Sequence, residues 1–359
     1  MRIAIDISQI AYQGSGVGRF TEGLVKAICK YDNQNEWIFF YSSLRRSIDA
    51  SIKEVIEAKN FSLIESKLPP TLLGFVWNKL HFFQIDRIIG EVDWLITSDW
   101  TEPPSKNRKA TIVHDLVYLK YPETVDSLVR TTQENRLHWV LKESSIIFAD
   151  SDSTKHDLET MLFFDKNKIV VNYPGVYQEK VSSIKYQVSK ERPFILTVGK
   201  REPRKNLERL VEAFKQLKRD DIDLYIVGMD GWGKVSIEND PQIKLLGFVS
   251  DDKLMRLYRS CLLFVMPSLY EGFGYPVIEA MSCGAPVATS NSSSLREIAG
   301  NAAVLFDPLS VESMVEGLKK IINSPDLRKE LSKKGLNRSS EFTWKNYYDT
   351  MIKVLSSKF

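Results

Sequence analysis

The sequence predicts an α/β protein with two domains, each built around its own parallel β-sheet. The chain has 359 residues, more than one ordinary hydrophobic core accommodates. Short apolar runs alternate with amphipathic stretches, as buried parallel strands alternate with the helices that cover them. This alternation stops after Gly175 and begins again at Phe194. We therefore expect two Rossmann-like domains that face a central cleft.

The first domain is expected at residues 1–172, followed by a polar linker at 173–192. Its strands are RIAIDI (2–7), WIFFYS (37–42), WLITS (94–98), ATIVHDL (110–116), SIIFADS (145–151) and KIVVNY (168–173). Each is apolar on both faces, as a strand covered on both sides should be. Amphipathic helices are expected over Thr21–Lys30 and Val129–Glu143.

The second domain is expected at residues 193–341. Its strands are FILTVG (194–199), LYIVG (224–228), IKLLGFV (243–249), LLFVMPS (262–268), APVATS (285–290) and AAVLF (302–306). Residues 342–359 then predict a terminal helix that crosses back to the first domain.

Composition excludes several classes of protein. A net charge of +3 lacks the basic excess of a nucleic-acid binder. The three cysteines, Cys29, Cys261 and Cys283, are far apart and odd in number, and they form no metal-ligand cluster with the histidines, so a reducing compartment is expected. No signal peptide opens the chain, and no apolar run is long enough to span a bilayer. The sequence predicts a cytoplasmic protein.

Two motifs in the first domain each allow two interpretations. The glycines of QGSGVGRF (13–20) do not complete a dinucleotide fingerprint. They form either a flexible loop whose N–H groups bind an anion at a helix start, or a plain βα turn. The triad DSD (150–152) is typical of a metal–diphosphate site in one class of sugar transferases, but it stands at a strand end before a helix. We favour a helix N-cap.

A cationic cluster follows the first strand of the second domain. The stretch TVGKREPRKNL places Lys200, Arg201, Arg204 and Lys205 between a strand and a helix that Asn206 opens. Such a run is usually a solvated surface. Here it lies at the carboxyl end of a strand, where open α/β sheets bind ligands, and over a helix N-terminus. We therefore expect it to bind a diphosphate.

The segment EGFGYPVIEA (271–280) carries an acid near each end, Glu271 and Glu279, around a turn that leads into a helix. Together with VGKREPRKNL, LYIVG and the early GVGRF, it resembles the large family of retaining GT-B glycosyltransferases. That family includes sucrose synthases and bacterial mannosyl- and glucosyltransferases. The likeness is densest over Phe194–Pro308 and extends through TIVHDLVYLKYPE in the first domain.

The resemblance implies a role for each acid. Glu271 contacts the hydroxyls of the donor sugar, and Glu279 holds the ribose of the nucleotide. A carboxylate accepts two hydrogen bonds, as a vicinal diol requires. Lys205 is the diphosphate-binding lysine, supported by the cations Arg204 and Lys200. Main-chain N–H groups of three residues between the acids face the sugar and the diphosphate: Phe273, Gly274 and Tyr275.

The remaining implied site residues lie in both domains. His114 touches the transferred sugar. Gly16 and Gly18 belong to a loop that closes over phosphate and acceptor. Phe248 and Val249 line the base pocket, mostly with main-chain atoms. The expected catalytic residues are therefore His114, Glu271 and Lys205, and no metal or other cofactor is expected.

The implied reaction moves a hexose from a nucleotide sugar to a glycan or lipid-linked glycan, with retention, in surface polysaccharide synthesis. GDP-mannose is the first choice of donor, and UDP-glucose or another UDP-hexose is the runner-up. The alternatives are a UDP-sugar epimerase, a nicotinamide dehydrogenase and a non-catalytic sugar-nucleotide-binding protein. Residues 69–83 (PPTLLGFVWNKLHFF) are either an acceptor or peripheral membrane contact or a buried helix.

Overall fold

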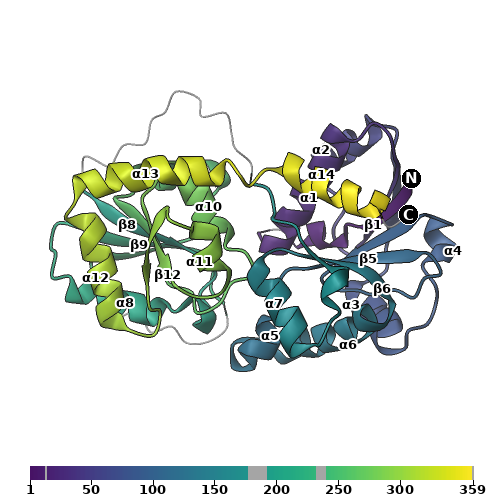
Figure 1. Ribbon diagram of the computed structural model, residues 1–359, viewed down its shortest axis with the longest axis horizontal. Coiled ribbons are helices and arrows are strands. Elements are labelled where there is room, and N and C mark those ends of the chain that lie inside the picture. Colours follow the sequence, from purple (N-terminus) through teal and green to yellow (C-terminus); the bar gives the residue numbers. More distant parts are fainter. Residues whose placement is uncertain (13, 177–191, 232–239, 358–359) are drawn as a thin grey trace. The chain divides into compact units, whose positions relative to one another are not determined.

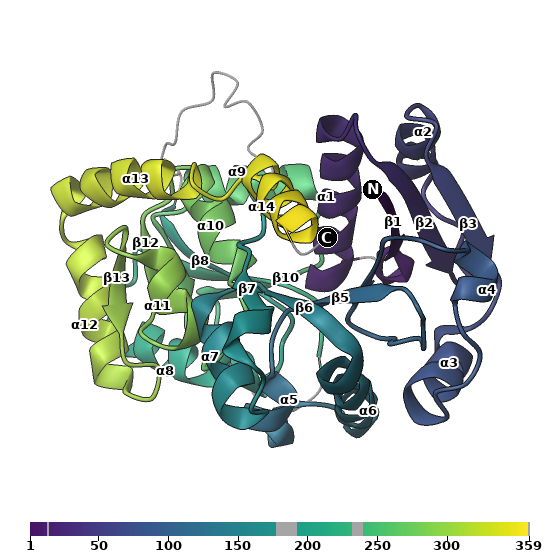
Figure 2. The same cartoon turned by 45° about the vertical axis from the view of Figure 1, so that its right-hand side comes forward.

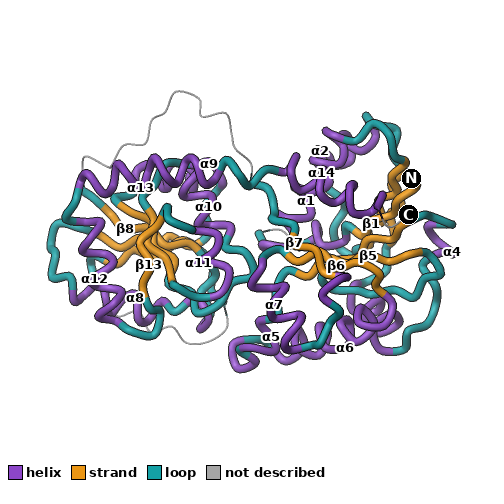
Figure 3. The backbone as a smooth tube through the Cα atoms, viewed as in Figure 1, coloured by secondary structure: helices purple, strands orange, loops and turns teal. Residues whose placement is uncertain are grey.

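The computed structural model describes residues 1–12, 14–176, 192–231 and 240–357. The chain divides into two compact units: unit 1 is Met1–Tyr177 with Thr343–Phe359, and unit 2 is Gln178–Phe342. In each unit a layer of strands is covered by helices (Figures 1 and 3). The predicted α/β class is confirmed. Most of the predicted linker at 173–192 lies outside the described residues.

Unit 1 contains a seven-stranded parallel sheet among its described residues, in the order β3-β2-β1-β4-β5-β6-β7. Its strands are β1 (Arg2–Asp6), β2 (Glu36–Ser42), β3 (Ser62–Ser66), β4 (Trp94–Ser98), β5 (Arg108–Val113), β6 (Ser144–Ala149) and β7 (Ile169–Val171). Sequence analysis missed β3 because this edge strand has no apolar run and no buried residue.

The helices of unit 1 connect these strands and cover both faces of the sheet (Figures 1 and 2). They are α1 (Gly16–Tyr31), α2 (Ala50–Glu57), α3 (Pro70–Leu73), α4 (Asp86–Ile89), α5 (Val117–Lys120), α6 (Ser127–Glu143), α7 (Asp152–Met161) and α14 (Trp344–Ser357), with a π-helical turn η2 (Gly74–Lys79) and the 3₁₀ turns η1 (Ser8–Ala11), η3 (Pro122–Thr124) and η4 (Lys166–Lys168).

Unit 2 contains a six-stranded parallel sheet among its described residues, in the order β10-β9-β8-β11-β12-β13. Its strands are β8 (Phe194–Val198), β9 (Asp223–Val227), β10 (Ile243–Gly247), β11 (Leu263–Met266), β12 (Val287–Ser290) and β13 (Ala303–Phe306). Its helices are α8 (Leu207–Gln216), α9 (Asp251–Ser260), α10 (Tyr275–Ser282), α11 (Ser293–Ala299), α12 (Val311–Ile322) and α13 (Pro325–Ser339), with the 3₁₀ turn η5 (Pro203–Lys205).

Both sheets have the strand order of a Rossmann fold. In unit 1 the order reverses between β1 and β4, and in unit 2 it reverses between β8 and β11. Loops that leave the carboxyl ends of such neighbouring strands diverge to opposite faces and open a crevice. The topology therefore marks the β8 and β11 loops of unit 2 as a ligand site.

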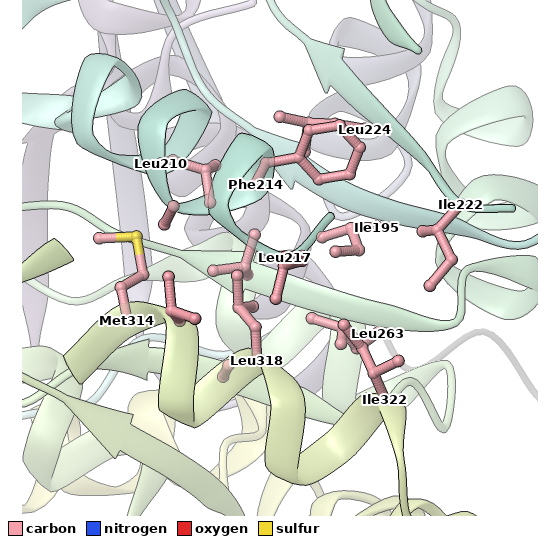
Figure 4. Packing of buried hydrophobic residues seen from close by; sticks show 14 of the residues in the cluster. Ile195, Leu210, Phe214, Leu217, Ile222, Leu224, Leu263, Met314, Leu318 and Ile322 are labelled. Carbon is pink, nitrogen blue, oxygen red and sulfur yellow. The ribbon is translucent and has the colours of Figure 1, made fainter. Parts of the chain in front are cut away.

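A hydrophobic core in unit 2 supports these strands (Figure 4). Four positions of α8 share one face at helical spacing and are buried: Leu207, Leu210, Val211 and Phe214. They join the same cluster as Met314 and Leu318 of α12. The core fixes the start of α8, and so the loop that precedes it.

The terminal helix α14 packs on α1 within unit 1. A Cβ on Gly23 of α1 would lie 2.1 Å from Trp344 Cζ2, so only glycine allows this approach. Phe20 of α1 makes edge contacts with the rings of Trp344 and Tyr347. The amide of Asn172 donates to the carbonyl of Tyr347 at 3.1 Å. The end of the chain thus completes the first unit.

Candidate active site

The loop after β8 carries the predicted cationic cluster. It turns through η5 and ends at Asn206, which adopts a left-handed conformation (φ 58°) at the start of α8. The buried side-chain amide of Asn206 donates to the carbonyls of Pro267 and Pro308 at 3.0 and 2.7 Å. Because a buried amide is costly to leave unsatisfied, these bonds fasten the loop to the segments that follow β11 and β13.

The loop after β11 carries Glu271 and is tied to the first loop. The main-chain N–H of Leu269 donates to the carbonyl of Arg204 at 2.9 Å. The N–H of Glu271 donates to Ser293 Oγ at 3.0 Å, and the hydroxyl of Ser294 donates to the Glu271 carbonyl at 2.8 Å. The start of α11 thus holds the main chain of Glu271 in place.

Two cations of the first loop meet the Glu271 carboxylate. Lys205 Nζ lies 2.7 Å from Oε1, and Arg204 Nη1 lies 2.8 Å from Oε2. Burial would raise the pKa of Glu271, but the charges of Arg204 and Lys205 outweigh it and lower this pKa to about 2. Burial, partly offset by Glu271, lowers the pKa of Lys205. The site therefore holds an ionised carboxylate between fixed positive charges.

The turn after Glu271 leads directly into α10. Gly274 stands at its N-cap with φ 98°, and a Cβ there would lie 2.7 Å from Leu295 Cδ2. Glycine is required on both counts. The helix begins at Tyr275, directly after this glycine. The N–H groups of a first helical turn have no partner within the helix, so this turn is suited to an anionic or polar ligand.

The second acid, Glu279, lies on α10 and is half-buried. The hydroxyl of Tyr258 on α9 donates to Glu279 Oε2 at 3.1 Å, which orients the carboxylate. Sequence analysis missed Tyr258 because its side chain is fully buried and occupies an apolar position of α9. The seven residues between the acids place Glu271 in the loop and Glu279 just over one turn into the helix.

The other predicted residues of unit 2 differ in exposure. The Lys200 side chain is 46% exposed, and its Nζ lies 3.8 Å from Glu202 Oε1. Phe248 is 65% exposed while Val249 is buried, and both follow β10 at the edge of the sheet. Their predicted role in lining a base pocket with main-chain atoms remains a prediction.

His114 stands just beyond β5 in unit 1 and is held by polar contacts. Its Nδ1 lies 2.7 Å from Asp150 Oδ2, its Nε2 lies 3.1 Å from Ser98 Oγ, and its ring meets the edge of Phe20. Burial opposes the charged form, but Asp150 outweighs it and raises the pKa of His114. Ser98, His114 and Asp150 lie at the carboxyl ends of the strands β4, β5 and β6, respectively.

The interpretation of DSD as a helix cap is confirmed for Ser151 and needs correction for both acids. The cap of α7 is Ser151, whose hydroxyl accepts from the Thr154 N–H at 3.0 Å. Asp150 is the buried partner of His114. Asp152 lies in the first helical turn and accepts from the hydroxyl of Tyr173 at 3.0 Å. The sequence carried one signal for the pairing of Asp150 with His114. Each residue stands at the end of a strand, and the two strands are neighbours in the sheet.

Gly16 and Gly18 are also placed differently from the prediction. Both lie in the first turn of α1 rather than in a loop before it. The N–H of Gly18 donates to Oγ of the N-cap residue Ser15 at 3.0 Å. That N–H is therefore engaged in capping the helix, and the predicted helix over Thr21–Lys30 is longer at its N-terminus.

We expect Asp150→Asn to lower the pKa of His114. The Asp150 charge favours the imidazolium, so removing it removes the cause of the raised pKa while an oxygen remains for the Nδ1 hydrogen bond. The measurement is a proton NMR titration, in which the chain's four histidines give four signals. A His114→Gln variant assigns the signal of His114.

The same pair has a consequence for stability. A raised histidine pKa stabilises the fold at pH values below the ordinary histidine pKa, and this contribution is lost as the pH rises through the raised value.

The matched control for the pKa measurement is Asp165→Asn, because Asp165 is exposed in the same unit. An unchanged His114 pKa in Asp150→Asn would show that the carboxylate does not control the charge of the ring.

Comparison with known proteins relates this chain to glycosyltransferases. Residues 179–338 match the model of the family glycosyl transferases group 1. O-antigen chain mannosyltransferase B of Escherichia coli is 25% identical over 96% of this chain and 97% of its own length. The matched part of the chain, residues 179–338, belongs to the group 1 glycosyltransferase family. The glycosyltransferase is also 29% identical to O-antigen chain mannosyltransferase RfbU of Salmonella typhimurium, over 71% of this chain and 73% of that protein.

Solved structures show the fold of this glycosyltransferase. Sucrose-phosphate synthase from Thermosynechococcus elongatus superposes with a TM-score of 0.75 and 19% identity, covering 100% of this chain and 99% of that one. Two parallel-sheet α/β units of this kind form the GT-B fold. In the described part of the chain, every helix is too short or too polar to cross a membrane.

Proposed function

We propose that this glycosyltransferase moves mannose from GDP-mannose to a hydroxyl of a glycan or lipid-linked glycan, with retention, in surface polysaccharide synthesis. The observation that carries the proposal is the convergence of Lys205, Arg204 and Glu271 at the strand-order reversal of unit 2. The choice of mannose is supported by the relatives of this chain that are named mannosyltransferases.

The proposed chemistry assigns a role to each group. The diphosphate leaves with negative charge, which the positive charges of Lys205 and Arg204 stabilise. As these cations turn to the diphosphate, the Glu271 oxygens become available to the sugar hydroxyls. The protein acts by positioning and charge. We propose that no metal takes part.

The sugar nucleotide is identified by a thermal-shift screen of GDP-mannose, UDP-glucose and other UDP-hexoses against the full chain. A ligand at a hundredfold its Kd stabilises a protein by about 2.7 kcal/mol. GDP-mannose is expected to give the largest shift. A larger shift with a UDP-hexose would establish the runner-up donor, and binding without turnover on any glycan acceptor would favour the non-catalytic alternative.

Glu279→Ala is expected to weaken donor binding by about 1.5–3 kcal/mol, because a charge-assisted hydrogen bond to the ribose is lost. The fold should remain intact, since the half-buried carboxylate supports no hydrophobic core. Calorimetric titration with GDP measures the loss. Glu212→Ala is the control, because it removes an exposed acid from α8 in the same unit. Equal GDP affinities in Glu279→Ala and native protein would exclude the ribose contact.

A further inference from the structure

The end of strand β4 in unit 1 is fixed more firmly than a strand end requires. Ser98, its last residue, is 2% exposed. The Ser98 carbonyl accepts from the buried side-chain amide of Gln9 at 2.7 Å and from the N–H of Trp100 at 2.9 Å. Gln9 belongs to η1, which follows β1. The main chain at Ser98 is therefore held by a neighbouring segment as well as by its own loop.

The residue that follows Ser98 is strained. Asp99 has φ of 53°, a left-handed conformation that costs free energy in residues other than glycine. The side-chain amide of Gln133 on α6 donates to the Asp99 carbonyl at 3.0 Å and to Asp99 Oδ1 at 3.1 Å. Strained positions persist where neighbouring contacts hold them, and they cluster at functional sites. The strain therefore favours a functional role for the end of β4.

The side chain that this strand end presents is in contact with His114. Ser98 Oγ lies 3.1 Å from His114 Nε2, while Asp150 Oδ2 lies 2.7 Å from Nδ1. The hydroxyl of Thr154 donates to the His114 carbonyl at 3.2 Å, and the His114 side chain is 13% exposed. Both ring nitrogens are therefore engaged within unit 1. Held in this way, His114 acts on a substrate by its position and charge rather than by exchanging a proton.

The two partners of the imidazole ring differ in their chemistry. An ionised carboxylate only accepts hydrogen bonds, so Asp150 requires a proton on Nδ1. A hydroxyl can donate or accept, so Ser98 donates to Nε2 of a neutral ring and accepts from Nε2–H of a charged one. Burial lowers the pKa of the ring, and the charges of Asp150, Asp99 and Asp115 outweigh it. The neighbour of the ring on α1 is the apolar side chain of Phe20. Ser98 therefore satisfies Nε2 in both charge states.

We propose that Ser98 is a positioning residue, whose hydroxyl holds His114 in one orientation beside the transferred sugar. This inference rests on the proposed sugar transfer and on the expected contact between His114 and the sugar. Without the Ser98 hydroxyl, the ring is held at Nδ1 alone and can tilt about that bond. Misplacement of an active-site group is costly in rate, so the effect should appear in catalysis rather than in nucleotide binding.

Ser98→Ala is expected to lower the rate of sugar transfer at saturating sugar nucleotide by about tenfold, because one hydrogen bond that orients the ring is lost. GDP affinity, measured by calorimetry, should remain native because GDP lacks the sugar. Ser98→Cys keeps the volume of the side chain but has only a weak donor, so its rate should fall as well.

The matched control is Ser144→Ala, which removes a similarly buried hydroxyl from the amino end of β6. Among the described residues, Ser144 Oγ has no hydrogen-bond partner. This variant should transfer sugar at the native rate. Circular dichroism checks that each variant is folded.

A second measurement observes the hydrogen bond itself, by NMR of the full chain isotopically labelled at the histidine nitrogens. Long-range proton–nitrogen spectra distinguish the two ring nitrogens and show which of them carries a proton. The His114→Gln variant assigns the signals of His114. In Ser98→Ala we expect the Nε2 resonance to move toward that of a nitrogen without a hydrogen bond, while Nδ1 keeps its proton. Ser144→Ala should give the native spectrum.

A native transfer rate in folded Ser98→Ala would overturn the proposal, and so would an unchanged Nε2 resonance. A loss of rate in Ser98→Ala that is absent in Ser98→Cys would also overturn it, because Ser98 would then act by filling space. A native chain without any transfer activity would instead contradict the proposed function. The NMR comparison tests the contact between Ser98 and His114 independently of that result.

Discussion

Lys205→Ala is expected to lower the rate of sugar transfer by about a hundredfold or more, the usual scale for removing a donor that stabilises transition-state charge. The Lys205 side chain is only 12% exposed and lies 2.7 Å from Glu271, so water cannot readily replace its charge next to the leaving diphosphate. The measurement is the initial rate of nucleoside diphosphate release in the presence of acceptor.

Two comparisons make this result specific. Lys320→Ala removes an exposed lysine from α12 in the same unit and should leave the rate unchanged.

Adding EDTA to the native protein should also leave the rate nearly unchanged, because the cations of the protein stabilise the charge of the leaving diphosphate. If EDTA abolished transfer and magnesium or manganese restored it, the electrostatic account would fail. Asp150 and Asp152 would then have to leave their contacts with His114 and Tyr173 to bind the metal.

Glu271→Gln is expected to lower transfer about tenfold to a hundredfold for each charge-assisted hydrogen bond to the sugar that weakens. GDP affinity should not fall with it. In the native chain Glu271 pairs with Arg204 and Lys205, so it competes with a diphosphate for both cations. The amide ends that competition. Steady-state rates and GDP calorimetry together measure the two effects.

The unliganded variant should also be less stable, by about 1–3 kcal/mol, because two largely buried cations lose a charged partner. The control is Glu316→Gln on the exposed side of α12. A parallel loss of GDP affinity and transfer in Glu271→Gln would show that this carboxylate holds the nucleotide rather than the sugar.

The fold could be predicted from the sequence because its strands are buried on both faces. WLITS at Trp94–Ser98 is β4 to the residue, with all five positions buried. Strand β3 could not be found in the same way, since an edge strand has no such apolar run. The start of α1 was missed because Gly16 and Gly18 resemble a loop, while the capping hydroxyl of Ser15 makes them helical.

Residues of the candidate site could be predicted where each belongs to a short motif within one loop. Lys205 and Glu271 were singled out from two motifs, although their contact spans 66 positions in the chain and depends on Asn206 joining the loops. Asp150 and Tyr258 were missed because each acts through a distant partner, His114 or Glu279. Spacing along the chain does not reveal such partners.

Residues 69–83 show what sequence alone leaves open. Leu73 and Trp77 fit the interpretation as a buried helix, while Phe75 and Phe82 fit a contact surface. The interpretation as a buried helix holds for part of the segment, and the interpretation as a contact surface remains a prediction. Left-handed residues His81 and Phe83 turn the chain there, and their conformation could not be read from the sequence.

The central claim is that the nucleotide binds at the carboxyl edge of the unit 2 sheet, between the loops that carry Lys205 and Glu271. Calorimetric titration of GDP into four full-length proteins tests it most directly: the native chain, Lys205→Ala, Glu279→Ala and His114→Ala. The account predicts weaker binding by about tenfold or more in the two unit 2 variants, and native affinity in His114→Ala. Native affinity in Lys205→Ala and Glu279→Ala, with loss in His114→Ala, would contradict it.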